Sequence, residues 1–161
     1  MPRSNLSIEG AHIFWKNFSG KPSQYNAEGS RNFCVELTPE LADALAADGW
    51  NIKHTVPKED GDISVPYMQV SVAYGNYPPK IYKVTSKNKT LLDEDLVGDL
   101  DRDEISNVDL IISPYHWTIG TKSGIKAYCK TMYVTIVEDD FAKKYAYLDD
   151  EEELPFEEFE R

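Results

Sequence analysis

The chain has 161 residues, of which 41% are hydrophobic and 28% charged, and its net charge at pH 7 is −11. This length predicts one domain that can bury a full apolar core without metals or disulfides, and no stretch approaches the roughly 20 apolar residues that a membrane span requires. The N-terminus lacks the pattern of a secretory signal peptide, so we expect an intracellular protein with no membrane partner.

Strand-like runs rich in Val, Ile, Thr and Tyr dominate the sequence. They predict strands over residues 6–18, 30–37, 50–56, 66–74, 80–85, 108–119 and 125–137. One clear helix is predicted after the second strand, with Thr38 as N-cap, Pro39 at the first helical position and Gly49 at its end. Residues 93–105 and 139–147 are candidates for further short helices.

Turn-rich segments separate these elements. Polar loops are predicted at 19–29 and 57–64, and Gly120–Gly124 is predicted to join the last two strands as a hairpin. Many short strands with one internal helix favour a mainly-β fold. The best candidate is an oligonucleotide-binding (OB) fold: a closed or partly open five-stranded barrel with extra strands and an acidic C-terminal tail.

The last thirteen residues form a separable acidic tail. Residues 149–161 contain eight acidic residues and one basic residue, which is −7 of the net charge and leaves −4 for residues 1–148. We therefore predict a folded domain at 1–148 and an interaction tail at 149–161, because clustered like charges oppose folding. Its candidate anchors for a partner are Leu154, Pro155, Phe156 and Phe159. The alternative is a solvated end that only aids solubility.

Motifs of catalysis and metal binding are absent, so no enzyme activity, cofactor or catalytic residue is predicted. The three histidines, His12, His54 and His116, fall in different predicted strands, which gives no metal site. Cys34 and Cys129 lie in separate apolar runs and are predicted to be reduced core thiols.

One acidic motif resembles the start of a calcium loop. Asp99, Asp101 and Asp103 have the right spacing, but Glu104 stands where Gly is needed and Leu110 where a bidentate Glu is needed. We therefore interpret this segment as a solvated acidic face and predict no metal site.

The final hairpin alternates in a way that indicates a binding surface. Successive side chains of a strand point to opposite faces, so Ile125, Ala127 and Cys129 should face the core. The opposite face is then basic–aromatic–basic, which suits phosphates and a stacked base. Its members are Lys126, Tyr128 and Lys130, joined from the partner strand and the turn by Tyr115, Trp117 and Lys122. The alternative is an amphipathic strand with cross-strand aromatic packing.

Basic and aromatic residues are interleaved elsewhere too, while acids cluster at 93–109 and in the tail. This segregation predicts a basic groove on an acidic protein. Further candidate nucleic-acid contacts are Lys16 beside Trp15, Tyr25, Arg31, Lys53, Lys80, Tyr82, Lys83, Lys87 and Lys89. Phe14, Phe33 and Trp50 are expected to be core residues instead.

Several strings in the sequence resemble a family of phage-encoded single-stranded DNA-binding proteins. They include Ile8–Ala11, Asn17–Lys21, Arg31–Val35, Asp48–Lys53, Asn107–Tyr115 and Gly124–Thr135, and the resemblance covers roughly residues 5–147. It implies an OB-fold and sequence-independent binding of single-stranded DNA in phage replication or recombination, and therefore action in the host cytoplasm.

The tail is separately similar to that of bacterial single-stranded DNA-binding proteins, which end in an acidic run and a Pro-Phe tip. Here five residues follow Phe156, so that ring does not carry the terminal carboxylate. The resemblance implies a tail that competes with DNA and recruits replication or recombination proteins. Two alternatives are kept: a protein-interaction module or DNA mimic that inhibits a host DNA-binding protein, and a nuclease. The oligomeric state is left open.

Overall fold

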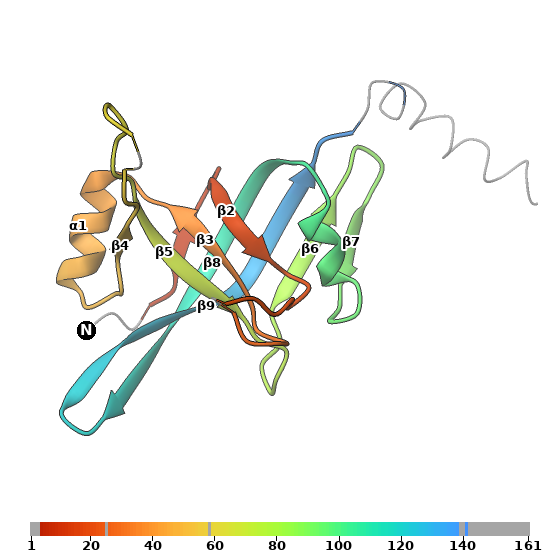
Figure 1. The fold of residues 1–161 in the computed structure, drawn as a ribbon. Helices are drawn as coiled ribbons and strands as arrows, with labels where there is room; N and C mark the ends of the chain where they lie inside the picture. The colour runs from red at the N-terminus through yellow and green to blue at the C-terminus, as the bar shows by residue number, and fades with distance from the viewer. Residues whose placement is uncertain (1–3, 25, 58, 139–140, 142–161) are drawn as a thin grey trace, which may run out of the picture.

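The computed structural model describes residues 4–24, 26–57, 59–138 and 141, and over these residues the fold is mainly β (Figure 1). It contains one α-helix, α1 (Pro39–Ala47), and one 3-10 helix, η1 (Val97–Asp101). The strands are β1 (Leu6–Ile8), β2 (Ile13–Asn17), β3 (Arg31–Glu36), β4 (Lys53–His54), β5 (Pro66–Val72), β6 (Lys80–Val84), β7 (Lys89–Leu92), β8 (Ile105–Ile119) and β9 (Lys122–Ile136).

The strands form one open, coiled sheet with an OB-like topology. Its order is β1-β8-β9-β5-β3-β2, with β4 paired to β5 and the β6–β7 hairpin paired to β9. β9 runs parallel to β5 and β6, and the other pairs are antiparallel. The predicted mainly-β, OB-like fold is confirmed, and because the hydrogen-bonded path of the described strands does not close, the sheet is open.

The two ends of that path, β1 and β2, are consecutive in the chain. The link between them bonds to both sides of the opening: Ala11 N donates to Val108 O at 2.7 Å, and Glu36 N donates to His12 O at 2.9 Å. The predicted strand over 6–18 is therefore two short strands. The break falls at Gly10, whose φ of 61° is left-handed and interrupts an extended chain.

The predicted helix after the second strand is confirmed. Thr38 Oγ1 accepts a hydrogen bond from Leu41 N at 3.2 Å, and Pro39 occupies the first turn. Ala42 and Leu45 are the buried residues of α1. Gly49, at φ 101°, reverses the chain after the helix and leads it to Trp50, which bridges to Ile125.

A bulge in β9 keeps apolar side chains inside along the whole strand. Ile112 pairs with Cys129 and Ile111 with Thr131, so Lys130 is an extra residue. Before it, Ile125, Ala127 and Cys129 are buried, as predicted. After it, burial shifts to the even positions Met132 and Val134. Because side chains alternate with a period of two, an unbroken strand would turn one of these sets to solvent.

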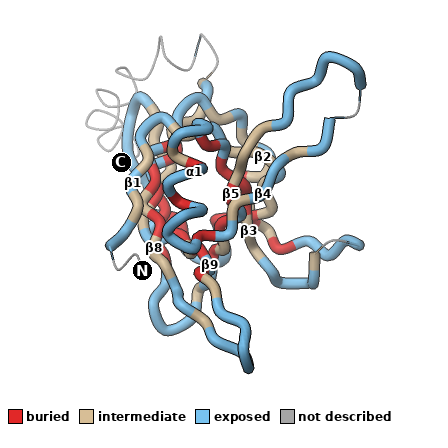
Figure 2. Tube along the Cα trace, turned by 90° about the vertical axis from the view of Figure 1, so that its left-hand side faces the viewer, coloured by how far each residue is buried: buried red, intermediate tan, exposed pale blue. Residues whose placement is uncertain are grey.

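The core lies on the inner face of the coiled sheet (Figure 2). Phe33 (0% exposed) and Trp50 (5%) are core residues as predicted, whereas Phe14 is half-buried and packs on the outer face. Cys34 and Cys129 are free and buried. Cys129 belongs to the core as predicted, whereas Cys34 lies on the outer face of β3 and is not part of the core cluster.

Other predicted elements differ in extent or type, and one cannot be compared. The strand over 50–56 shortens to β4, because Trp50 bridges to Ile125 and only Lys53 and His54 pair with β5. Residues 93–105 hold the 3-10 helix η1, and β7 was not predicted. The predicted helix over 139–147 lies outside the described residues, apart from an exposed Phe141.

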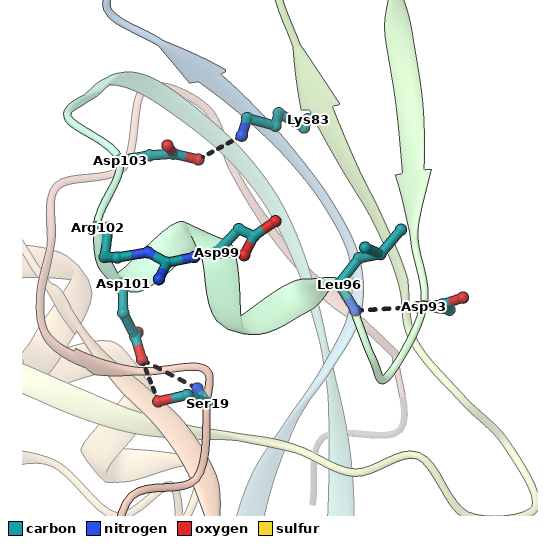
Figure 3. Close-up of polar contacts among 8 residues, drawn as sticks. All are labelled: Ser19, Lys83, Asp93, Leu96, Asp99, Asp101, Arg102 and Asp103. Carbon is teal, nitrogen blue, oxygen red and sulfur yellow. Dashed lines mark hydrogen bonds and ion pairs between the residues drawn. The ribbon is translucent and has the colours of Figure 1, made fainter.

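Two aspartates of the predicted acidic face, Asp101 and Asp103, make structural contacts, whereas Asp99 forms an exposed ion pair. Asp101 holds the end of β2. Its carboxylate accepts a hydrogen bond from Phe18 N at 2.7 Å. It also accepts hydrogen bonds from Ser19 N at 3.0 Å and Ser19 Oγ at 2.6 Å (Figure 3). Gly98 permits this contact, since a Cβ there would lie 3.1 Å from Ser19 Cβ.

The neighbouring carboxylates point to other partners. Asp103 pairs with Lys83 Nζ at 2.7 Å, and Asp99 pairs with Arg102 at 2.8 Å (Figure 3). The three groups therefore do not converge as calcium ligands do. In the described part of the chain, no group of three or more His, Cys, Asp or Glu residues is arranged to hold a metal ion.

We predict that Asp101→Ala destabilises the domain by about 1–3 kcal/mol, because two backbone N–H groups lose their acceptor. Denaturant unfolding followed by fluorescence measures this free energy. The matched control is Asp99→Ala, which removes only the exposed pair with Arg102 and should cost at most about 1 kcal/mol. Equal losses for the two variants would show that the Asp101 carboxylate does not anchor β2.

Candidate nucleic-acid interface

The hairpin of β8 and β9 gathers aromatic and basic side chains on its outer face. Opposite residues of an antiparallel pair share a face, and Tyr115 pairs with Lys126, Trp117 with Gly124 and Ser113 with Tyr128. The rings of Tyr115 and Tyr128 meet edge to face at 6.1 Å, and Lys126 Nζ lies 5.1 Å from the Tyr128 ring centroid. We call Tyr115, Trp117, Lys126 and Tyr128 the hairpin platform.

A glycine makes room for the indole of this platform. A Cβ at Gly124 would lie 2.9 Å from Trp117 Cζ2 and 3.1 Å from Trp117 Nε1. The ring therefore lies directly on the β9 backbone. Tyr115 is 57% exposed, so a large part of the platform is open to a ligand. Figure 1 shows the hairpin extending away from the sheet at lower left.

The outer face continues from the hairpin platform onto β5 and β3. Ser71 is level with Tyr128 across the parallel pair, and Gln69 is level with Cys34. A groove of about 560 Å³ lies here, lined by Trp117 and Lys126 of the platform, by β5 and by residues 49–51. Burial raises the pKa of the Cys34 thiol to about 11, so this thiol is neutral at physiological pH.

A second aromatic group lies on the same face at β2. Trp15 contacts Phe14 at 4.8 Å and Tyr67 at 5.4 Å, and Phe14 contacts Tyr67 at 5.4 Å, all edge to face. We call these three residues the β2 cluster. It borders a groove of about 900 Å³ whose lining includes Lys21, Lys53 and Gln69. Gln69 thus lines both grooves.

Trp15 has an unusual backbone. Its φ is 48°, and it is the one non-glycine residue with positive φ in the described part of the chain. The pairing of β2 with β3 shifts register between Phe14 and Asn17, so a bulge aims both Phe14 and Trp15 outward. Such a conformation costs on the order of 1–3 kcal/mol for a bulky residue.

The loop between β2 and β3 is held in shape by Asn26. Its Nδ2 donates to the carbonyls of Lys21 and Ser30 at 2.9 Å and of Ala27 at 3.1 Å. Asn17 also bonds Lys21 in both directions. Lys21 is therefore presented at the groove by a preformed loop. Tyr25, a predicted contact, lies outside the described residues.

The predicted site residues fall into groups. The groove face carries the hairpin platform and the exposed Lys53, and the exposed Lys122 and Lys130 lie on β9. Lys16 Nζ instead donates to the carbonyls of Leu100 and Asp103, each at 2.7 Å, and Lys83 is paired with Asp103. These two lysines are engaged within the fold.

Arg31 points away from the groove face. It shares its side of β3 with the buried Phe33 and Val35, and its guanidinium lies 5.8 Å from the Tyr74 ring. Sequence alternation alone identifies this side once the strand is known, because Arg31 and Phe33 are two residues apart.

The remaining predicted contacts form a separate surface on β6 and β7. Tyr82 stacks on Tyr133 at 4.9 Å, and Lys89 Nζ lies 4.8 Å from the Tyr82 ring and 5.6 Å from the Tyr133 ring. Lys80 and Lys87 are exposed nearby. Tyr133 lies five residues beyond Tyr128, roughly 16 Å along β9. This surface is therefore not part of the groove.

Sequence analysis missed two aromatic residues of the groove face, Trp15 and Tyr67, and the adjacent Lys21. Tyr67 carries a usable signal: it alternates with the buried Met68 and shares a face with Gln69. Trp15 carries none, because its outward direction depends on the bulge in β2.

Comparison with solved structures identifies the fold. The model is similar to the single-stranded DNA-binding protein of bacteriophage Enc34 in complex with ssDNA (TM-score 0.54, 7% identity, 84% of this chain and 88% of that chain covered). It is also similar to a C-terminal truncation of the Enc34 protein (TM-score 0.50, 10% identity, 84% and 87% covered). At these identities the likeness establishes the fold alone. No curated protein matches the sequence.

Within the described residues, neither helix has the length and apolar character required to cross a bilayer.

Membership of a family rests on the sequence itself. The family model described as a putative phage ssDNA-binding domain matches residues 1–157, almost the whole chain. The chain therefore belongs to the family of phage single-stranded DNA-binding domains.

Proposed function

We propose that this protein binds single-stranded DNA without reading its base sequence and that it serves phage DNA replication or recombination in the host cytoplasm. The observation that carries the proposal is the hairpin platform, where partly exposed rings and Lys126 share one face beside an open groove. Family membership supports single-stranded DNA as the ligand. We propose a binding protein without catalysis.

The proposed mechanism combines charge and stacking. Exposed lysines of the groove face and of β9, namely Lys53, Lys122, Lys126 and Lys130, contact phosphates and release counterions. Tyr115, Trp117 and Tyr128 stack on bases, which every base accepts because each has a π-face. A duplex hides those faces between its base pairs, so the same rings favour single strands.

The acidic tail is proposed to compete with DNA and to recruit partners. Its net charge of −7 attracts the same lysines as the DNA backbone does. Because the tail is tethered, its effective concentration at the groove is millimolar for a short flexible link. When DNA occupies the groove, Leu154, Phe156 and Phe159 become available to a replication or recombination protein.

We predict that single-stranded DNA binds with micromolar or tighter affinity and that this affinity falls about tenfold or more between low and physiological salt. Titration of oligo(dT) at several salt concentrations, followed by fluorescence anisotropy, measures it. A mixed-sequence oligonucleotide should bind similarly, and a duplex of equal length more weakly. Salt-independent binding, or a preference for duplex, contradicts the mechanism.

We predict that Tyr128→Ala lowers affinity for oligo(dT) by roughly five- to a hundredfold while leaving a cooperative thermal transition, because one stacked base is lost. The control is Tyr133→Ala, on the same strand but outside the hairpin platform and 37% exposed. An equal loss from both variants would mean that the contact is not specific to the hairpin platform. Loss of the thermal transition in Tyr128→Ala would make Tyr128 a packing residue.

We predict that deletion of residues 149–161 tightens binding of single-stranded DNA, most strongly at low salt, where screening is weakest. The same deletion should abolish capture of phage replication proteins. Affinity is compared for full-length and truncated protein over a salt series. Equal affinities at low salt would show that the tail does not enter the groove, and unchanged partner capture would remove its proposed second role.

A further inference from the structure

We infer that Trp15 is a second base-stacking residue and that a bound single strand crosses the sheet from the β2 cluster to the hairpin platform. This inference rests on the proposed binding of single-stranded DNA and adds a site that the hairpin alone does not contain. The ligand at Trp15 is a nucleobase with the phosphate that follows it.

The indole of Trp15 has a free face. It is 64% exposed, and its contacts with Phe14 and Tyr67 are edge to face, at interplanar angles of 74° and 87°. Neither neighbour stacks in parallel on the indole, as Tyr82 does on Tyr133 at 14°, and the 64% exposure leaves ring surface open to a ligand. The β2 cluster therefore presents a rigid ring beside the 900 Å³ groove.

The backbone of Trp15 is strained in a way that the core does not require. The core beneath is filled by Phe18 and Phe33, which are fully buried and stacked at 5.4 Å. Glycine adopts a φ of 48° without a steric cost, whereas a tryptophan at the same φ is strained. Strain that persists outside the core and exposes an aromatic ring is typical of binding sites.

Two lysines line the same groove as the Trp15 ring. Lys53 is level with Tyr67 in the β4–β5 pair, and Lys21 is fixed at the groove by Asn17 and Asn26. A base stacked on Trp15 thus has positive charge nearby. The preformed loop lowers the entropy cost of that contact, since its backbone is already ordered.

The two aromatic groups are joined by a polar floor. From β2 to β9 the face crosses β3 and β5, three strand spacings or about 14 Å. At roughly 3.4 Å per stacked nucleotide, this distance corresponds to about four nucleotide steps. Gln69, exposed at the centre, lines the grooves on both sides. Oligonucleotides shorter than about four nucleotides should engage one group, and longer ones both.

The test compares three substitutions at one position. Trp15→Ala and Trp15→Gly both remove the ring, and each should lower affinity for (dT)₁₂ about tenfold. Trp15→Tyr keeps a stacking ring and should lose less than threefold. Trp15→Gly should be more stable than Trp15→Ala, because only glycine fits the backbone. The control is Tyr77→Ala, which removes a ring that is 94% exposed and lines neither groove.

The outcomes distinguish base stacking by Trp15 from a purely structural role of this residue. Equal losses for Ala and Gly despite different thermal stabilities support stacking, while affinity that follows stability, or unchanged affinity in all three variants, overturns the inference. In the Trp117→Phe variant, binding of oligo(dT) should quench the fluorescence of Trp15, because the other remaining tryptophan, Trp50, is buried. If wild-type protein fails to bind any oligonucleotide, the proposed function falls instead.

Discussion

The two-residue repeat of side chains along β9 is the constraint on which the rest of this fold depends. β9 borders β8 along one edge and, along the other, first β5 and then β6. The extra residue at Lys130 falls between these two partners and moves burial from odd to even positions. One strand can thereby serve two parts of a coiled sheet without turning apolar groups outward. Along β9, Tyr128 lies before this bulge and the β6–β7 surface lies after it.

A β-bulge also determines which side chains face outward in β2, at the edge of the 900 Å³ groove. In β2 the register shift before Asn17 sets Phe14 and Trp15 on the outer face, and Asp101 fixes the chain that follows. Acidic residues near the groove are thus engaged in structural contacts: Asp101 with β2 and Asp103 with Lys83. Within the described residues no polar or charged side chain is fully buried, so these contacts lie at the margin of the core.

Patterns among neighbouring residues correctly predicted the structural features that depend on local backbone geometry. Helix α1 followed from Thr38, Pro39 and Gly49, and the inner face of β9 followed from alternation at 125–129. The roles of Lys16 and Lys83 were not predictable in this way, because their partners lie far along the chain, as with Lys16 and Leu100. The direction of Trp15 and the open edge between β1 and β2 depend on tertiary packing, which overrides the strand pattern.

The pairing of β1 with β8 has a consequence for how the protein is made. Leu6 lies opposite Ile112, and β8 is completed as a hairpin by residues up to Ile136. The first strand to leave the ribosome therefore waits for nearly the whole domain before its partner exists. The β8–β9 hairpin is local and closes quickly, whereas β1 must return over a long loop, which slows folding. After β8 has emerged and before β1 docks, β8 keeps one unpaired edge, which can pair with other chains during synthesis.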